Sequence, residues 1–448
     1  MKKIYLLLLP VLILFASETF AQNTLSLEEC KQLALLNNSK SKNSKLEVEA
    51  SKQAKKSAFT NYFPSISAGG IAWSGNKSLM EMDIEGGDLP VYDGNPANLA
   101  SATQFAYFPD MSMGMLKEGT TGYINAMQPV FAGGRIVNGN KLAALSEEVS
   151  KLNYKLTKNE ILLSTTEQYW TIVSLKEKLK TILKYEKLLQ RLLQQVDDAY
   201  NSGIVMKNDV LKVKLQLSEI ELNKSKLENG IELATLALSQ YLGTAIDSST
   251  IFNEELEVSD LPQSSYVEKN EALKKRTEYS LLEKSVTAEK LLTKIKLGEY
   301  LPQAGIGVSG IYMKFDGGDD RTLGMVYGTV SVPISNWWGG SHELKERSIK
   351  EEIAENNFQN NSELLILQIE KSWQELTEAY KQYQLAEESE AQAEENHKVN
   401  EDSYQNGLIT VSDLLEAQAL LQQTKDQVTD AKTNYLVKKA AYLQVTGR

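Results

Sequence analysis

Cysteine, histidine and a basic patch are all scarce or missing in this chain of 448 residues. Cys30 is the only cysteine, which excludes an intrachain disulfide and a metal site built from several thiolates. His342 and His397 are far apart, and no spacing around them supports a zinc site or a catalytic triad. We therefore expect no catalytic residues, no metal and no cofactor, and we interpret both histidines as surface residues of helices.

The net charge of −11 argues against a nucleic-acid partner, because phosphate binding requires a basic stripe. The composition is otherwise that of a folded protein, with 42% hydrophobic and 24% charged residues. The many carboxylates suit solvated helix faces better than the active site of a hydrolase. These features favour a structural or transport role over an enzyme.

Long apolar runs are missing after the first residues, where a membrane-spanning helix would need about 20 such residues. Residues 1–21 carry Lys2 and Lys3, an apolar run from Ile4 to Phe15, and the ending Ser-Glu-Thr-Phe-Ala. This order is typical of a secretory signal peptide that is cleaved after Ala21. The alternative, a membrane anchor, is disfavoured because the apolar run is too short.

What the chain does have is an internal duplication. The segment 200–209 (YNSGIVMKND) returns 204 positions later as 404–413 (YQNGLITVSD). In each copy Gly203 or Gly407 comes before an aspartate and a long periodic run, which predicts a helix, a tight turn and a second, N-capped helix. We name these segments tip 1 (200–209) and tip 2 (404–413).

A second set of matches extends the duplication over nearly the whole mature chain. Tyr62 and Pro64 match Tyr300 and Pro302, 238 positions later. We therefore divide the chain into a first repeat (22–243), a linker (244–262) without strong periodicity, and a second repeat (263–448).

Each repeat contains a β-hairpin. In the second repeat, residues 302–334 alternate with period two on both sides of a DGGDD turn, which predicts two strands of about ten residues. The hairpin of the first repeat, 64–131, has strands at Ser65–Trp73 and about Gly122–Phe131. A long loop rich in Gly, Asp and Met separates them.

Very long helices follow the hairpins. From Arg135 to Tyr200 the only helix-breaking residue is Gly139, and Ser341–Tyr404 contains neither glycine nor proline. Each stretch predicts a helix of about 95 to 100 Å. The helices after the tips, of about 35 residues, carry heptad spacing that predicts coiled-coil packing. Leu25–Phe59 predicts one further helix of about 35 residues.

Isolated two-stranded hairpins are marginal in water, and their open edges are not tolerated in a bilayer. Four strands per chain therefore suggest a barrel that several subunits close together. Eight strands from a dimer or twelve from a trimer would both serve.

The chain resembles the TolC family of outer-membrane efflux and secretion channels. The resemblance rests on the duplicated YxxGxxxxxD tips, the FP and LP pairs at 63–64 and 301–302, and the segments QPVFAGGR and VPISNWWGG. It implies a mainly α fold with a small membrane β part. Long antiparallel coiled coils would form a periplasmic α-barrel, and three chains would share a twelve-stranded β-barrel.

The same resemblance implies a location and partners. A homotrimer would lie in outer-membrane lipid with a large periplasmic part. It would passively conduct cargo that it receives from an inner-membrane transporter through a periplasmic adaptor. We interpret the loop from about Ser74 to Thr121 as an extracellular lid rather than scaffold. The alternative function is a secreted or periplasmic coiled-coil protein with a structural or adhesive role.

Candidate site residues also follow from the resemblance. Asp413 and Glu416 match acidic positions that form rings at the periplasmic entrance, and such rings would favour cations. Crowding of these charges in a trimer should raise the pKa of at least one carboxylate. Asp413 alone could instead be only a helix N-terminal residue. Asp209 and Tyr404 match positions that link neighbouring helices in the closed state, whereas Ile409 replaces a basic residue of the best-known relatives.

Two further patterns have competing interpretations. Met111, Met113 and Met115 alternate and could bind Cu(I) through thioethers, although methionine also serves apolar loop contacts. The tryptophans divide into two groups: Trp73, Trp337 and Trp338 at predicted strand ends suit a membrane-interface girdle, and Trp170 and Trp373 suit helix packing.

Overall fold

The computed structural model describes residues 24–78, 80–247, 250–253, 255–315 and 319–448. The expected signal peptide, three linker positions and part of the DGGDD turn lie outside these residues. The chain folds as two compact units, and each takes elements from both repeats. The helical unit comprises residues up to Ala50, Glu148–Lys284 and Asn356–Arg448, and the strand unit comprises Ser51–Glu147 and Ser285–Glu355.

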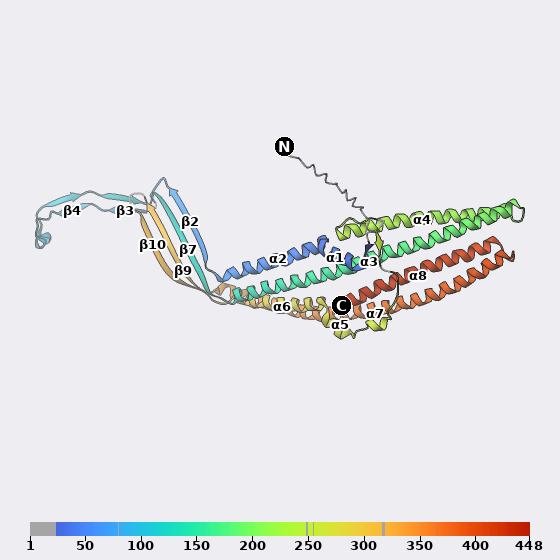
Figure 1. Cartoon of the computed structure of the whole chain (residues 1–448). Helices are drawn as coiled ribbons and strands as arrows, with labels where there is room; N and C mark the ends of the chain where they lie inside the picture. The colour runs from blue at the N-terminus through green and yellow to red at the C-terminus, as the bar shows by residue number, and fades with distance from the viewer. Residues whose placement is uncertain (1–23, 79, 248–249, 254, 316–318) are drawn as a thin grey trace, which may run out of the picture. The chain divides into compact units, whose positions relative to one another are not determined.

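Four helices dominate the helical unit, and they form two antiparallel pairs, as Figure 1 shows. The pairs are α3 (Arg135–Asn201) with α4 (Lys207–Leu242), and α7 (Trp337–Gln405) with α8 (Val411–Val445). The first helices of the pairs thus run through the long stretches that the sequence predicts. Within the described residues, no helix is both long enough and apolar enough to cross a bilayer.

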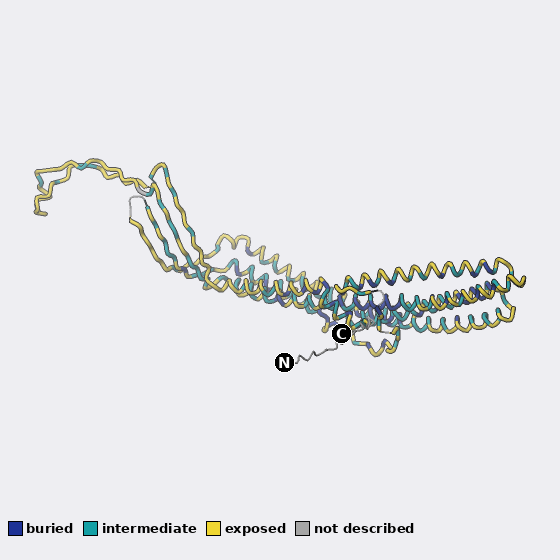
Figure 2. The backbone as a smooth tube through the Cα atoms, turned by 45° about the horizontal axis from the view of Figure 1, so that its top comes forward, coloured by how far each residue is buried: buried dark blue, intermediate teal, exposed yellow. Residues whose placement is uncertain are grey.

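The core of the helical unit follows the apolar spacing of these helices, and Figure 2 shows buried residues where they face one another. Leu189, Leu192 and Val196 of α3 pack in one cluster with Val210 and Val213 of α4 and with the start of α8. Complete burial of such a side chain contributes about 1.5 to 3 kcal/mol. The cluster therefore joins the two helix pairs close to the tips.

The expected single helix over Leu25–Phe59 is wrong. It is divided into α1 (Leu27–Asn37) and α2 (Ser39–Phe59). Asn38 has extended backbone (φ −58°, ψ 134°), its Nδ2 donates to the carbonyl of Tyr241 at 2.9 Å, and its Oδ1 accepts from the Lys40 amide at 2.8 Å. This contact with α4 stabilises a break that local helix propensity does not predict.

The second repeat breaks at the matching place. Arg276 separates α5 (Lys269–Lys275) from α6 (Thr277–Gly298), and it lies 238 positions after Asn38. Its guanidinium is buried and is bound to Glu278 and to Gln368, which lies on α7. The duplication thus includes the helix break, although the two repeats hold it with different side chains.

The linker region contributes a small parallel strand pair. β1 (Thr24–Leu25) pairs with β8 (Ile251–Phe252), and a 3-10 helix follows at Pro262–Ser265. The hydroxyl of Tyr169 donates to the carbonyl of Leu25 at 3.2 Å, and the ammonium of Lys176 donates to the carbonyl of Thr250 at 2.6 Å. Both side chains come from α3, so the linker and the start of the described chain are held against this helix.

The strand unit contains a four-stranded antiparallel sheet in the order β10-β9-β7-β2 (Figure 1). The bounds are β2 (Ser65–Ser74), β7 (Glu118–Ala132), β9 (Gln303–Phe315) and β10 (Arg321–Ser331). The two predicted hairpins therefore join through β7 and β9, with Tyr123 opposite Ile311. A register shift between Pro129 and Phe131 fits the missing amide hydrogen of proline.

The long loop of the first repeat is not irregular, contrary to expectation. It contains two antiparallel ribbons, β3 (Met80–Ile84) with β6 (Met111–Met115) and β4 (Gly87–Pro90) with β5 (Phe105–Phe108), and a 3-10 helix at Pro96–Ser101. These strands are short and are separated by Gly, Asp and Pro, which obscures their period in the sequence. We call residues 80–115 the ribbon.

Two short 3-10 helices flank the strands of the sheet along the chain: Thr60–Tyr62 precedes β2, and Ile334–Asn336 follows β10. The second leads directly into α7, which begins at Trp337, so Gly339 and Gly340 lie inside its first turns rather than before it. Trp337 and Trp338 are therefore helix residues and not strand-end residues, and the Trp337 indole donates to the carbonyl of Tyr300 at 2.8 Å. Trp73 does lie near the end of β2, as expected.

Candidate functional site at the two tips

Each tip is a helix end that reverses at a glycine. Gly203 and Gly407 have φ angles of 75° and 70°, in the left-handed region that favours glycine. The amides of Gly203 and Gly407 donate to the carbonyls of Tyr200 and Tyr404, both at 2.9 Å. A Cβ atom at either glycine would meet nothing within 4 Å, so the requirement is conformational and not steric.

A capping box begins the helix after tip 2. The amide and the hydroxyl of Thr410 both donate to one carboxylate oxygen of Asp413, at 2.8 and 2.7 Å, and the Asp413 amide donates back to the hydroxyl at 3.4 Å. These bonds lower the pKa of Asp413 from its ordinary value of 3.8. Asp413 therefore caps α8 as an ionised group, which is one of the two roles expected from the sequence.

The cap at tip 1 is weaker. Met206 takes the place of Thr410, and only its amide donates to the carboxylate of Asp209, at 3.3 Å. Asp209 also lies 3.7 Å from the ammonium of Lys212. The two aspartates match in the duplication, but their partners differ.

Lys212 connects the two tips. Its ammonium donates to the hydroxyl of Ser412 at 2.6 Å, and its charge contributes to the lowered pKa of Asp413. Lys212 is also the repeat counterpart of Glu416, 204 positions earlier. The helix start after tip 1 therefore carries a compensated pair, Asp209 with Lys212, whereas the helix start after tip 2 carries two carboxylates, Asp413 and Glu416. The sequence itself contains this difference in charge, at positions that the duplication matches.

Tyr404 and Asp209 also come together in one chain. Tyr404 packs against the core cluster that joins the helix pairs. Burial raises the pKa of its hydroxyl, and the negative charge of Asp209 adds to this effect. The expected role of this pair in linking neighbouring helices in the closed state stays a prediction.

Asp413 and Glu416 are both exposed and lie three positions apart, which places them on nearly the same side of α8. Whether they form rings depends on further copies of the chain, so their role at an entrance also stays a prediction. Ile409, which replaces the expected basic residue, is half-buried beside them.

Three exposed apolar side chains at the tips were not predicted. Ile204 and Leu408 are each 77% exposed and follow the two turn glycines directly, and Met206 is 76% exposed. Isolated exposed apolar residues are common, but Ile204 and Leu408 occupy matching positions of the two tips. The signal in the sequence was the apolar residue after each duplicated glycine.

The other candidate residues from the sequence have different outcomes in the structure. Within the described residues, no group of three or more His, Cys, Asp and Glu side chains can hold a metal ion. Register places Met82 opposite Met113 on the ribbon, so methionines face each other across its strands. Trp170 is buried and packs against Tyr169, as expected for a packing residue. The expectation of a surface position holds for His342 but is wrong for His397, whose side chain is only 12% exposed.

Comparisons with known proteins agree on one family. A family model described as outer membrane efflux protein matches residues 31–244 and 300–448. The outer membrane protein TolC of Escherichia coli (strain K12) is 20% identical over 305 residues, which are 64% of this chain and 62% of TolC. The chain thus matches less than two thirds of the length of that relative.

Solved structures of low sequence identity share the fold. The outer membrane protein VceC of Vibrio cholerae has a TM-score of 0.72 at 14% identity, covering 94% of this chain and 96% of VceC. The CmeC outer membrane channel of Campylobacter jejuni has a TM-score of 0.72 at 15% identity, covering 94% of this chain and 85% of CmeC. The expected mainly helical fold with a small strand part is therefore confirmed.

Proposed function

The chain belongs to the outer membrane efflux protein family, and from this premise we propose that it is the outer-membrane exit duct of a tripartite efflux or secretion system. The observation that carries the proposal is the match of the family model to both repeats, including both tips. As a duct the protein conducts cargo passively and performs no chemistry. The proposal covers three classes of cargo, namely drugs, metals and polypeptides.

Three copies assemble the duct in this proposal. The sheet order leaves β2 and β10 as outer strands, each paired on one side only within the described chain. Unpaired strand edges require a partner in a bilayer. Edge-to-edge pairing of β10 with β2 of the next copy would give twelve strands from three chains.

The tips serve as the periplasmic mouth and as the contact with the adaptor. Ile204, Met206 and Leu408 offer exposed apolar side chains at the turns, which suits contact with an adaptor protein. Lys212 supplies a basic group between the tips. Ile409 has an apolar side chain and cannot supply one. We infer that the resting state is held by Lys212 together with Asp209 and Tyr404, in place of the basic residue that is missing.

Fractionation and native mass spectrometry test the proposal together. The full chain, expressed in a Gram-negative host, should be found in the outer-membrane fraction, and native mass spectrometry from detergent should give three copies. The single cysteine, Cys30, is buried, so cysteines introduced on β2 and β10 can report on pairing between copies without background. A soluble monomer would contradict the duct and support the alternative, a secreted coiled-coil scaffold.

A further inference from the structure

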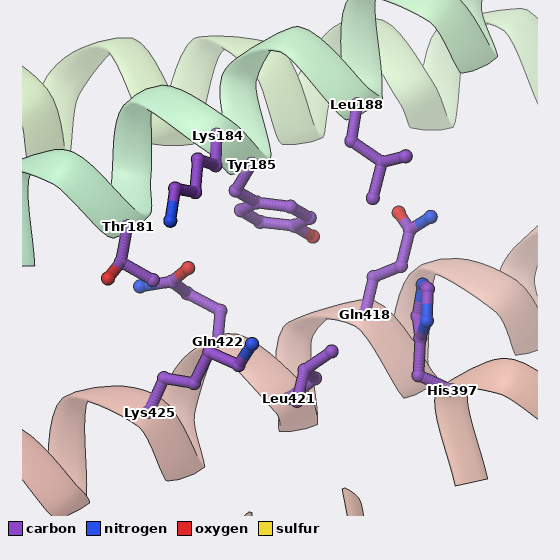
Figure 3. A pocket seen from close by; sticks show the side chains of 9 residues that line it. All are labelled: Thr181, Lys184, Tyr185, Leu188, His397, Gln418, Leu421, Gln422 and Lys425. Carbon is purple, nitrogen blue, oxygen red and sulfur yellow. The ribbon is translucent and has the colours of Figure 1, made fainter. Parts of the chain in front are cut away.

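The helical unit contains a cavity of about 170 Å³ between α3, α7 and α8. Figure 3 shows side chains from all three helices that point into the space between them. Its lining residues are Thr181, Lys184, Tyr185, Leu188, His397, Gln418, Leu421, Gln422 and Lys425. The tip residues described above do not line it, so it is a separate feature of the molecule.

Three polar atoms in this lining are buried without a hydrogen-bond partner in the described part of the chain. They are the hydroxyl of Tyr185, Oε1 of Gln418 and Nε2 of His397. Tyr185 is 7% exposed and Gln418 is 3% exposed. Native proteins keep few buried polar groups unpaired, and three around one cavity indicate that it holds a polar occupant.

The charges around the cavity favour an anion. No carboxylate is among its lining residues, although Glu401 lies 4.0 Å from Nδ1 of the lining residue His397 and the charge of Glu219 acts on Tyr185. Glu394 binds the ammonium of Lys425 at 2.9 Å, and Asp426 accepts from the Gln422 amide at 3.1 Å. Lys184 has no ion-pair partner among the residues that the structure describes.

Two of the three unpaired groups, those of Tyr185 and Gln418, can donate hydrogen bonds. Burial raises the pKa of Tyr185 to about 12, with a smaller effect of Glu219, so its hydroxyl keeps its proton at neutral pH. The amide of Gln418 can turn to present its nitrogen, because its two orientations have nearly the same shape. With the ammonium of Lys184, these groups give donors from two helices around one space (Figure 3).

Apolar side chains complete the lining. Leu188 of α3 and Leu421 of α8 border the same cavity. A cavity of about 150 Å³ is large enough for benzene, which sets the size of a suitable ligand. We propose that this cavity binds a small organic monocarboxylate with an apolar body, of about the size of benzoate.

The polar residues that line the cavity are not repeated at the matching positions of the duplication. At the positions related by the offset of 204, Lys184 and Tyr185 correspond to Glu388 and Ser389, and Gln418 corresponds to Lys214. The donor set is therefore particular to the place where the α3–α4 pair meets the α7–α8 pair. A bound carboxylate would connect helices of both repeats and would stabilise their contact.

Calorimetric titration of the purified full chain in detergent tests the proposal with three probes of matched shape. We expect benzoate to bind with a dissociation constant below about 1 mM, neutral benzamide at least tenfold more weakly, and cationic benzamidine not at all. Tyr185→Phe and Lys184→Gln should each weaken benzoate binding about tenfold, because each removes one donor to the carboxylate. Lys187→Gln removes the same charge from an exposed position of α3 that does not line the cavity, and it should have no effect.

Equal binding of benzoate and benzamide, or no binding of benzoate by a folded protein, would overturn the proposal and leave the cavity to ordered water. Thermal unfolding followed by circular dichroism controls for folding of each variant. If Tyr185→Phe is unstable, Lys184→Gln still decides, because the Lys184 side chain is exposed. The readout is binding alone, so the inference stands or fails independently of the proposed transport function.

Discussion

Asp413 completes the capping box that Thr410 begins at the start of α8, and this role has a pH dependence of known sign. Its folded-state pKa is lowered by the bonds from Thr410. A lowered carboxylate pKa contributes stability that is present above the unfolded-state pKa and is lost as the pH falls through the folded-state value. The cap is therefore complete at neutral and mildly acidic pH. In a trimer, crowding would have to overcome these bonds before it could raise the pKa of Asp413.

Replacement of Thr410 by valine tests the cap. Thr410→Val keeps the shape but removes the hydroxyl that donates to and accepts from Asp413. We expect the free energy of unfolding to fall by about 0.5 to 2 kcal/mol, the usual effect of losing a helix cap. Thr429→Val is the matched control, because among the described residues the Thr429 hydroxyl bonds only to the carbonyl of Lys425 in its own helix.

Chemical denaturation at pH 7 measures both variants. Equal stability of Thr410→Val and the wild type would show that the cap contributes nothing to tip 2. The same experiment at pH 3 should show a smaller difference between Thr410→Val and the wild type. Below the ordinary pKa of 3.8 the unfolded state takes up a proton at Asp413 before the folded state does, so the stability that the lowered pKa contributes begins to be lost.

At the scale of elements, the tip glycines and a helix glycine should respond in opposite directions. Gly407 has a positive φ angle and open space around it, so Gly407→Ala should cost only the conformational strain of about 1 to 2 kcal/mol. Gly139 lies inside α3, also with open space, and Gly139→Ala should stabilise by up to about 1 kcal/mol. Unfolding free energies of both variants decide this, and destabilisation by Gly139→Ala would contradict the account of glycine.

The elements that were predictable from the sequence are those with local signals. The long helices come from stretches with almost no glycine or proline, the residues of the main strands alternate with period two, and the tips carry glycine and capping residues. The break at Asn38 was not predictable, because it depends on a hydrogen bond to Tyr241, which is distant in sequence. The ribbon was missed because its strands are only four or five residues long.

The site was predictable to a similar degree. The capping role of Asp413 follows from its place after the turn, and the structure contains the bonds. The contact of Lys212 with Ser412 joins the two repeats and has no signature within either one. The same holds for His397, which is covered only because α3, α7 and α8 meet around it.

At the scale of the whole molecule, the ribbon should be dispensable for assembly. The amide of Gly75 donates to the carbonyl of Lys117 at 2.8 Å, so the pairing of β2 with β7 is complete before the ribbon begins. Replacement of residues 78–114 by a short turn should leave the number of copies unchanged in native mass spectrometry. Loss of the oligomer would mean that the ribbon is part of the scaffold and not a lid.

In the proposed function, several copies form a duct whose narrow mouth is built from the tips, and Asp413 and Glu416 set its ion preference. Single-channel recording in planar bilayers tests it most directly, with the wild type beside Asp413→Asn combined with Glu416→Gln. The control combines Glu388→Gln with Glu395→Gln, two exposed carboxylates of α7 away from the tip. We expect cation-selective conductance in the wild type and in the control, and weaker selectivity with reduced block by trivalent cations in the tip variant. Unchanged selectivity and block in the tip variant would show that these side chains do not line the mouth, and a wild-type protein that inserts without conducting would contradict the duct itself.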